Sequence, residues 1–292
     1  MKTFTGSLVA IITPFRNGKV DEKTLGDLIE WQIVSGTHGI VPCGTTGESA
    51  TLTHEEHNRV IQFAVEAVRD RVPVVAGTGS NSTDEAIALT RHAKKVGADA
   101  ALLISPYYNK PTQEGLYQHH KAVADAVDLP QILYNIPGRT AVNMTPQTVA
   151  RLAKIKNIVG IKEGAGSLQQ VSEIVELCGD RFTVLSGDDA LTLPMLALGA
   201  KGVVTVTANI APVEMAAMVD AWAAGDAAKA RAIHYKLYPL FQVLFLETNP
   251  IPVKHAVALM GKATAEFRLP LCPMSNDNLD KLARVMKDYG LI

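Results

Sequence analysis

The sequence predicts an α/β protein in which eight parallel strands, each followed by a helix, close into a barrel, with further helices at the C-terminus. Eight short apolar runs recur along the first two thirds of the chain, and the segments between them carry helix signals. The runs are nearly continuous in Val, Ile and Leu, as expected of parallel strands that are covered on both faces. Eight strand-helix units are the number that closes a (β/α)8 TIM barrel.

Length and composition fit a folded protein of this class. The chain has 292 residues, a net charge of −1 and 47% hydrophobic residues. It has no cationic surplus for binding nucleic acid and no apolar run of the roughly 20 residues that span a membrane. Three widely spaced cysteines, Cys43, Cys178 and Cys272, favour neither disulfides nor a zinc site. We therefore expect a cytoplasmic protein without nucleic-acid or membrane partners.

The expected strands are spaced regularly. Successive runs start about 20 to 35 residues apart, which leaves room for one strand, one crossover helix and two short loops. The first run is not read as a signal peptide, because Pro14 and Arg16 follow where a cleavage site would lie. The runs begin near Leu8, Gly39, Pro73, Ala100, Pro130, Ile158, Phe182 and Gly202.

Helix starts lie between these runs. Thr53 and Ser82 each stand three residues before a glutamate, a spacing that lets the hydroxyl cap the first turn. Thr145 precedes a proline, which favours the first helical position. We expect His119 and His120 on the solvent-exposed face of another helix.

The chain is expected to divide into a catalytic barrel, residues 1–224, and a C-terminal helical region, residues 225–292. Helix-like stretches follow Pro212 and are interrupted at Gly225, at Pro250 and in a proline-rich loop near Pro270. Their apolar faces can pack on the barrel or on a neighbouring subunit. The alternative fold is a doubly wound sheet, but the candidate dinucleotide turn at Gly77 and Gly79 lacks its third glycine.

Reacting groups of such barrels lie at the carboxyl ends of the strands. The polar residues at these positions and in the loops that follow them are Thr13, Thr45, Thr46, Glu48, Tyr107, Tyr108, Tyr134, Arg139, Lys162, Asp188, Asp189 and Asn209.

Lys162 is the most informative of these residues. It follows Ile158, Val159 and Ile161 in a strand that should be buried. Desolvation disfavours an ammonium ion, and the neutral amine that remains attacks carbonyl carbons. A Schiff base with a keto acid is one interpretation. The alternative is a structural lysine that reaches the barrel rim or pairs with Glu163 or Asp188.

Three neighbouring features would complete such a site. The turn from Gly44 to Glu48 presents amides and two hydroxyls that suit a carboxylate, although such turns are also common in loops that bind nothing. Tyr134 can exchange protons or simply lie hydrogen-bonded in the core. Arg139 can hold a carboxylate or lie alone on the surface. We expect no metal, since the sequence HEEH at His54 is not HExxH, and no organic cofactor.

Seven motifs together carry a family resemblance, which runs from about Gly6 to the C-terminus. They are GTTGESATL, SPYYNKPTQEG, YNIPGRT, GIKEGAG, LSGDDA, VTAN and NPIPVK. In these motifs the sequence resembles the 4-hydroxy-tetrahydrodipicolinate synthase (dihydrodipicolinate synthase) family of pyruvate-dependent class I aldolases. The resemblance implies a lyase that condenses pyruvate with L-aspartate 4-semialdehyde in lysine biosynthesis, without a cofactor and as a homotetramer.

The resemblance also implies roles for individual residues. Lys162 would form the Schiff base with pyruvate, and Tyr134 would move protons together with Thr45 and with Tyr108 of a neighbouring subunit. Thr45 and Thr46 would hold the pyruvate carboxylate, and Arg139 would receive the carboxylate of the semialdehyde. Gly187 and Val204 would border the pocket.

Many members of the family are inhibited by L-lysine at a subunit interface. The matching residues are Ser49, Ala50, His54, His57, Asn81, Glu85 and Tyr107. The alternative is that these residues only line a polar interface groove. Cys43, which lies beside the expected pocket, is a possible alkylation target.

Two other functions stay open at this point. A related aldolase would cleave sugar keto acids instead, although Arg139 favours a partner with a second carboxylate. A non-catalytic amino-acid sensor on the same scaffold would bind lysine but form no Schiff base, and the set of Lys162, Tyr134, Thr45 and Tyr108 argues against it.

Overall fold

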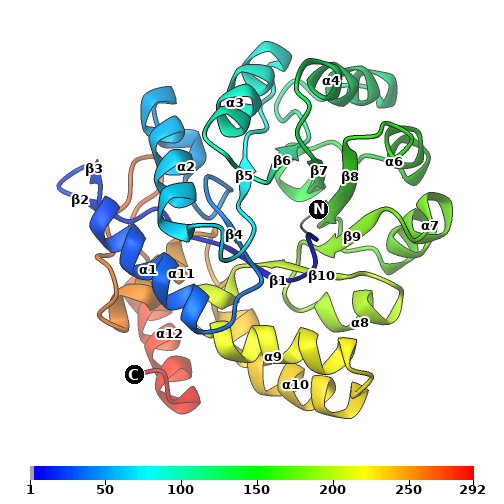
Figure 1. Cartoon of the computed structure of the whole chain (residues 1–292). Coiled ribbons are helices and arrows are strands. Elements are labelled where there is room, and N and C mark those ends of the chain that lie inside the picture. Colours follow the sequence, from blue (N-terminus) through cyan, green and yellow to red (C-terminus); the bar gives the residue numbers. More distant parts are fainter. Residues whose placement is uncertain (1–2) are drawn as a thin grey trace.

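Eight parallel strands form a closed ring surrounded by helices in the computed structural model, which describes residues 3–292 (Figure 1). β1 pairs with both β4 and β10, and the sheet continues in order to β5. The ring closes where the Ile40 amide donates to the Pro73 carbonyl at 3.0 Å. The predicted barrel is confirmed, and the doubly wound alternative is wrong. The strands are β1 Gly6–Ala10, β4 Gly39–Val41, β5 Val75–Gly77, β6 Ala100–Ile104, β7 Gln131–Asn135, β8 Ile158–Glu163, β9 Thr183–Ser186 and β10 Gly202–Thr205.

All eight strands lie on the predicted runs. A small hairpin of β2, Phe15–Arg16, and β3, Lys19–Val20, was not predicted. It lies in the loop after β1, where two-residue strands leave no periodic pattern in the sequence. No helix of residues 3–292 is long and apolar enough to cross a membrane.

The helices begin where the capping residues predict. Thr53 caps α2 by accepting from the Glu56 amide at 3.2 Å, and the Glu56 carboxylate accepts from the Thr53 amide. Ser82 and Thr145 cap α3 and α6 by accepting from the amides of Glu85 and Thr148. The helices are α1 Glu22–Val34, α2 His54–Val68, α3 Thr83–Lys95, α4 Gln113–Ala126, α5 Pro137–Thr140, α6 Pro146–Leu152, α7 Leu168–Cys178, α8 Thr192–Ala197, α9 Pro212–Ala223, α10 Ala227–Val243, α11 Ile251–Leu259 and α12 Asn276–Tyr289.

The C-terminal helices pack on the barrel of their own chain. α10 lies along α9, and α12 packs against α10 and α11, as seen at the bottom of Figure 1. The loop between α11 and α12 reaches back to the start of the chain, where the Thr264 hydroxyl donates to the Phe15 carbonyl at 2.6 Å. This contact places residues from both ends of the sequence beside the turn after β4.

Two expectations about individual side chains are wrong. His119 and His120 are buried, because their positions on α4 face inward, and their rings stack edge to face at 5.0 Å. Burial lowers the pKa of His119 to about 4, so its ring is neutral at pH 7. Cys43 is 3% exposed, its thiol points at the His57 carbonyl, and burial raises its pKa, which makes it a poor alkylation target.

Candidate active site

Lys162 and Tyr134 lie side by side at the carboxyl ends of β8 and β7. They are register partners in the parallel pair, and the lysine Nζ lies 4.1 Å from the centroid of the tyrosine ring. Both side chains are buried, with Lys162 6% exposed. Tyr134 also belongs to the apolar cluster inside the barrel. The strand therefore holds an amine within a mostly apolar interior, next to a phenol.

The structural alternatives for Lys162 are wrong. Successive residues of a strand face opposite sides, so Glu163 points away from the barrel interior. Its carboxylate accepts hydrogen bonds from Asn135 Nδ2, from Gln170 Nε2 and from the Ala165 amide. Burial raises the pKa of Glu163. The Asp188 carboxylate accepts from the amides that follow it. Within residues 3–292 no ion pair engages Lys162, and its side chain is buried, so it does not extend into solvent.

The turn after β4 is fixed from several sides. The Gly47 amide donates to the Gly44 carbonyl at 3.0 Å, and the Glu48 amide donates to the Thr45 carbonyl at 3.1 Å. Thr46 is buried, and its hydroxyl oxygen accepts from Asn249 Nδ2 at 3.0 Å. A hydroxyl that accepts in this way keeps its own hydrogen for a further acceptor. The turn can thus offer hydroxyls to a carboxylate.

A cavity of about 410 Å³ opens beside this turn. Thr45 and Arg139 line it together with six of the seven residues of the expected lysine site. It is completed by segments near Thr248 and Pro270 from the C-terminal region. The predicted residues that line it are Thr45, Glu48, Arg139, Ser49, Ala50, His54, His57, Glu85 and Tyr107.

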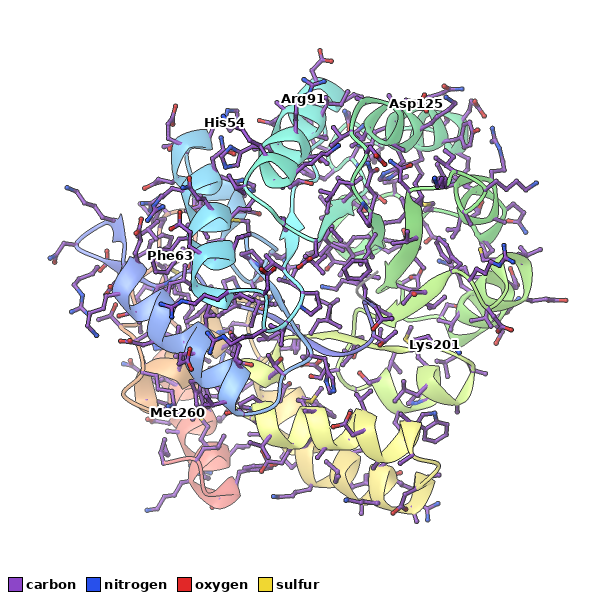
Figure 2. All side chains as sticks on the ribbon, in the orientation of Figure 1. His54, Phe63, Arg91, Asp125, Lys201 and Met260 are labelled. Atoms are coloured by element: carbon purple, nitrogen blue, oxygen red, sulfur yellow. The ribbon has the colours of Figure 1, made fainter. Side chains whose placement is uncertain are left out.

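Four of the seven expected lysine-site residues form two hydrogen-bonded pairs, His54 with Glu85 and Asn81 with Tyr107. His54 lies at the start of α2 (Figure 2), and its Nε2 is 2.6 Å from a carboxylate oxygen of Glu85 on α3. The Ser80 hydroxyl donates to the other Glu85 oxygen, and this bond holds the pKa of Glu85 below its usual value. Burial lowers the pKa of His57 to about 4. Asn81 lies outside the cavity lining but donates to the Tyr107 carbonyl at 3.2 Å.

The other predicted residues take different places. Tyr108 is 92% exposed and has a positive φ of 72°, so it points away from its own barrel. Gly187 follows β9, and a Cβ there would lie 3.0 Å from the Glu163 carbonyl oxygen. Val204 is buried inside the barrel in the same cluster as Tyr134. Arg139 lies on α5 and donates to the Asn249 carbonyl at 3.1 Å.

Some polar residues at the strand ends hold the scaffold together. Asp189 accepts from the amides of Val206 and Thr207, and burial raises its pKa. Asn209, in the 3₁₀ turn after β10, accepts from the Ile12 amide and donates to the Ala10 carbonyl at the end of β1. A position at a strand end therefore does not by itself distinguish residues of the site from residues that stabilise the fold.

Residues of the C-terminal region were missed by reasoning from strand ends. Asn249 contacts both Thr46 and Arg139, and Lys254 forms a buried ion pair with Glu48 at 2.5 Å. The motif NPIPVK, which contains both residues, was the one signal in the sequence that could have located them.

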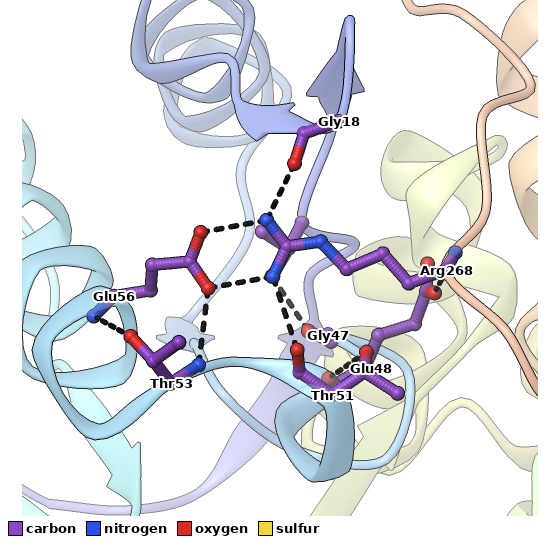
Figure 3. A network of polar contacts seen from close by, with 8 residues as sticks. Gly18, Gly47, Glu48, Thr51, Thr53, Glu56 and Arg268 are labelled. Carbon is purple, nitrogen blue, oxygen red and sulfur yellow. Dashed lines mark hydrogen bonds and ion pairs between the residues drawn. The ribbon is translucent and has the colours of Figure 1, made fainter.

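Arg268 connects the same turn to other elements (Figure 3). Its guanidinium donates to both oxygens of Glu56 at 2.6 Å, to the Thr51 carbonyl and to the Gly18 carbonyl. The Arg268 amide also donates to the Glu48 carboxylate at 3.4 Å. The loop that precedes α12 thus contacts the hairpin, the turn and α2 at once.

Comparisons with known proteins agree with the fold of the chain. The sequence model of the Dihydrodipicolinate synthetase family matches residues 3–289. The chain is 65% identical over 289 residues to a 4-hydroxy-tetrahydrodipicolinate synthase of Geotalea uraniireducens. The alignment covers 99% of this chain and 100% of the relative. The solved dihydrodipicolinate synthase of Aquifex aeolicus has a TM-score of 0.98 and 55% identity, over 99% of each chain. A dihydrodipicolinate synthase of Cyanidioschyzon merolae, solved with lysine bound, has a TM-score of 0.97 and 41% identity, over 100% of each chain.

Proposed function

Because the chain belongs to the dihydrodipicolinate synthetase family, we propose that it condenses pyruvate with L-aspartate 4-semialdehyde to 4-hydroxy-tetrahydrodipicolinate in lysine biosynthesis. The enzyme is a lyase of the class I aldolase type. The observation that carries the mechanism is a buried amine, Lys162, which has no ion-pair partner within residues 3–292 and lies against a tyrosine ring.

The chemistry follows from that amine. The Lys162 nitrogen attacks the keto carbon of pyruvate, and loss of water leaves an iminium ion. The iminium withdraws electrons from the neighbouring methyl carbon, which gives up a proton and becomes an enamine. The enamine carbon then attacks the aldehyde carbon of the semialdehyde and forms the new carbon-carbon bond. The amino group of the semialdehyde part then attacks the iminium carbon and closes the ring, and the bond from that carbon to Lys162 breaks, so that the lysine leaves as a free amine.

Residues around the amine have separate tasks in this proposal. Tyr134 moves the protons of the Schiff-base steps, together with Thr45 and with Tyr108 from a neighbouring subunit. Thr45 and Thr46 hold the pyruvate carboxylate. Arg139 receives the carboxylate of the semialdehyde, while Gly187 and Val204 border the part of the barrel interior where Lys162 binds pyruvate. The burial of Lys162 and Tyr134 and the exposure of Tyr108 support this division.

Borohydride trapping tests the mechanism. Reduction in the presence of pyruvate is expected to add one pyruvate-derived mass to the peptide that contains Lys162, because borohydride converts the iminium to a stable amine. Lys162→Met should abolish the adduct. Lys201→Met, which removes an exposed lysine before β10, should retain it. An unlabelled Lys162 in the wild-type protein would reject the mechanism.

Condensation itself is measured separately. A coupled assay with the semialdehyde distinguishes this activity from that of an aldolase for sugar keto acids, which would trap pyruvate but condense the semialdehyde poorly. A protein that binds lysine and traps no pyruvate would be a sensor and not an enzyme.

We further propose that the enzyme is a cytoplasmic homotetramer that L-lysine inhibits at the group around Glu85. The low pKa of Glu85 keeps its carboxylate ionised at neutral pH, as binding of an ammonium requires. The relative from Cyanidioschyzon merolae with lysine bound supports the proposal. Lysine should lower the initial rate of the wild type, and Glu85→Gln should weaken this inhibition at least tenfold. An equal response of both proteins to lysine would mean that the group only lines a groove.

A further inference from the structure

The buried ion pair between Glu48 and Lys254 is not used by the mechanism above. Lys254 lies on α11 in the C-terminal region, and Glu48 ends the turn that carries Thr45 and Thr46. Their charged atoms are 2.5 Å apart, and both side chains are 0% exposed. The pair joins two positions that are 206 residues apart in the sequence.

The surroundings of Lys254 leave its ammonium group in one position. Its Nζ lies 4.3 Å from the centroid of the Phe15 ring and 5.1 Å from that of Phe267, and it donates to the Glu266 carbonyl at 2.6 Å. A buried ion pair is a weak source of stability, because desolvation offsets much of the attraction between the charges. What such a pair provides is a fixed geometry for the groups attached to it.

Glu48 is the residue whose geometry is fixed. Its φ is 52°, a left-handed conformation that is unfavourable for a residue with a side chain. Its amide donates to the Thr45 carbonyl, and its own carbonyl accepts from the Thr51 amide. The backbone of Glu48 therefore closes the turn on one side and starts the Ser49–Thr51 3₁₀ turn on the other. Rotation of this residue would displace Thr45 and Thr46.

A second contact from the same C-terminal segment points to the same turn. Asn249 donates to the Thr46 hydroxyl, and its carbonyl accepts from Arg139. The segment from Asn249 to Lys254 thus contacts both the turn proposed to bind pyruvate and Arg139, which is proposed to bind the semialdehyde. The ion pair of Lys254 contacts only the turn.

We propose that Lys254 is a positioning residue, which through its ion pair with Glu48 holds Thr45 and Thr46 in the conformation that receives the carboxylate of pyruvate. This inference rests on the proposed function. It assigns a role in the reaction to a side chain that lies outside the barrel strands and does not touch the reacting atoms.

The test separates pyruvate binding from use of the semialdehyde. Lys254→Met keeps most of the length of the side chain and removes its charge. At temperatures well below its melting temperature, kcat/KM for pyruvate should fall at least tenfold, while kcat/KM for the semialdehyde changes less than threefold. Lys236→Met is the matched control, because Lys236 lies on the exposed side of α10 and pairs with Glu214 of α9. The activity of this variant should equal that of the wild type.

A double variant separates positioning from stability. Lys254→Met leaves a buried carboxylate without its partner, so the melting temperature should fall. Adding Glu48→Gln removes that charge and should restore much of the melting temperature, but kcat/KM for pyruvate should stay at least tenfold low. If Lys254→Met does not fold, kcat/KM for pyruvate and for the semialdehyde is compared in Glu48→Gln alone. This variant breaks the ion pair but keeps the shape of the Glu48 side chain.

Three results would overturn the proposal: an unchanged kcat/KM for pyruvate in a folded variant, an equal loss for both substrates, or recovery of pyruvate use along with the melting temperature in the double variant. Borohydride trapping of the wild type runs in parallel. If the wild type traps no pyruvate, the proposed function itself fails, whereas trapping with normal use of pyruvate by the variants rejects only the role of Lys254.

Discussion

At the scale of single residues, Lys162 and Glu163 are neighbours in β8 with opposite surroundings. The alternation of a strand sends Lys162 into the barrel beside Tyr134 and sends Glu163 outward to Asn135 and Gln170. The carboxylate that could have neutralised the amine is thereby occupied elsewhere. A one-residue shift of register would exchange the two side chains and remove the nucleophile from the site.

Arg139 carries a prediction at this scale. Arg139→Ala should lower kcat/KM for the semialdehyde about 10 to 100-fold, which corresponds to the roughly 1.5 to 3 kcal/mol of a charge-assisted hydrogen bond. Lys162 and the turn are untouched, so the rate of borohydride trapping with pyruvate should stay within about twofold of the wild type. Steady-state and trapping kinetics measure the two effects, with Arg139→Lys as an intermediate control. An equal loss in both would reject the role of Arg139.

Reasoning from the residues alone selected Lys162, Tyr134, Thr45 and Arg139, because each lies at the carboxyl end of a recognisable strand or in the loop that follows it. It could not separate these residues from Asp189 or Asn209, which also follow strands but bind backbone groups. That difference depends on contacts between segments that are distant in the sequence.

At the scale of elements, the loop before α12 contacts the hairpin of β2 and β3, the turn after β4 and α2. Arg268 in this loop bonds to the hairpin at Gly18, to Thr51 and to Glu56 near the start of α2 (Figure 3). The hydrogen bonds from Arg268 hold the pKa of Glu56 below its usual value. α2 is thus fixed at its first turn both by its own capping box and by a residue from the end of the sequence.

Arg268→Ala should lower the free energy of unfolding by about 1 to 3 kcal/mol, the cost of leaving a partly buried carboxylate and carbonyls without their donor. Urea denaturation at pH 7 measures the change. Arg284→Ala, at an exposed position of α12, serves as the control and should stay within about 0.5 kcal/mol of the wild type. Equal stability of the two variants would show that the Arg268 network contributes nothing measurable.

Elements were predicted more completely than the contacts between them. The strands and the caps of α2, α3 and α6 follow from local patterns of apolar and hydroxyl residues. The hairpin of β2 and β3 is too short for such a pattern, and the approach of Arg268 or Lys254 to the turn after β4 depends on the closed fold. NPIPVK was visible as a motif, but its contacts with Thr46, Glu48 and Arg139 were not.

At the scale of the whole molecule, two buried histidines link stability to pH. Burial lowers the pKa values of His57 and His119 from 6.5 to about 4. Between these values the unfolded chain takes up protons that the folded protein does not, so acid favours the unfolded state. The effect is absent above about pH 6.5 and is complete below about pH 4.

The free energy of unfolding should therefore decrease as the pH falls from 6.5 to 5, by up to about 1.4 kcal/mol per pH unit for each of these histidines. His119→Gln removes one titrating group and should make the decrease shallower by up to that amount. Urea denaturation of both proteins from pH 8 to pH 5 checks the prediction, with their difference at pH 8 as the baseline. Parallel curves for the two proteins would contradict it.

The position of Asn249 and Lys254 late in the sequence has a consequence for biosynthesis of the protein itself. The turn that should hold pyruvate is made early in translation, but its two anchors belong to the last fifth of the polypeptide. A growing chain can therefore assemble strands as they leave the ribosome and still have no ordered substrate cradle. The protein would become active only after the C-terminal helices have left the ribosome and packed on the barrel.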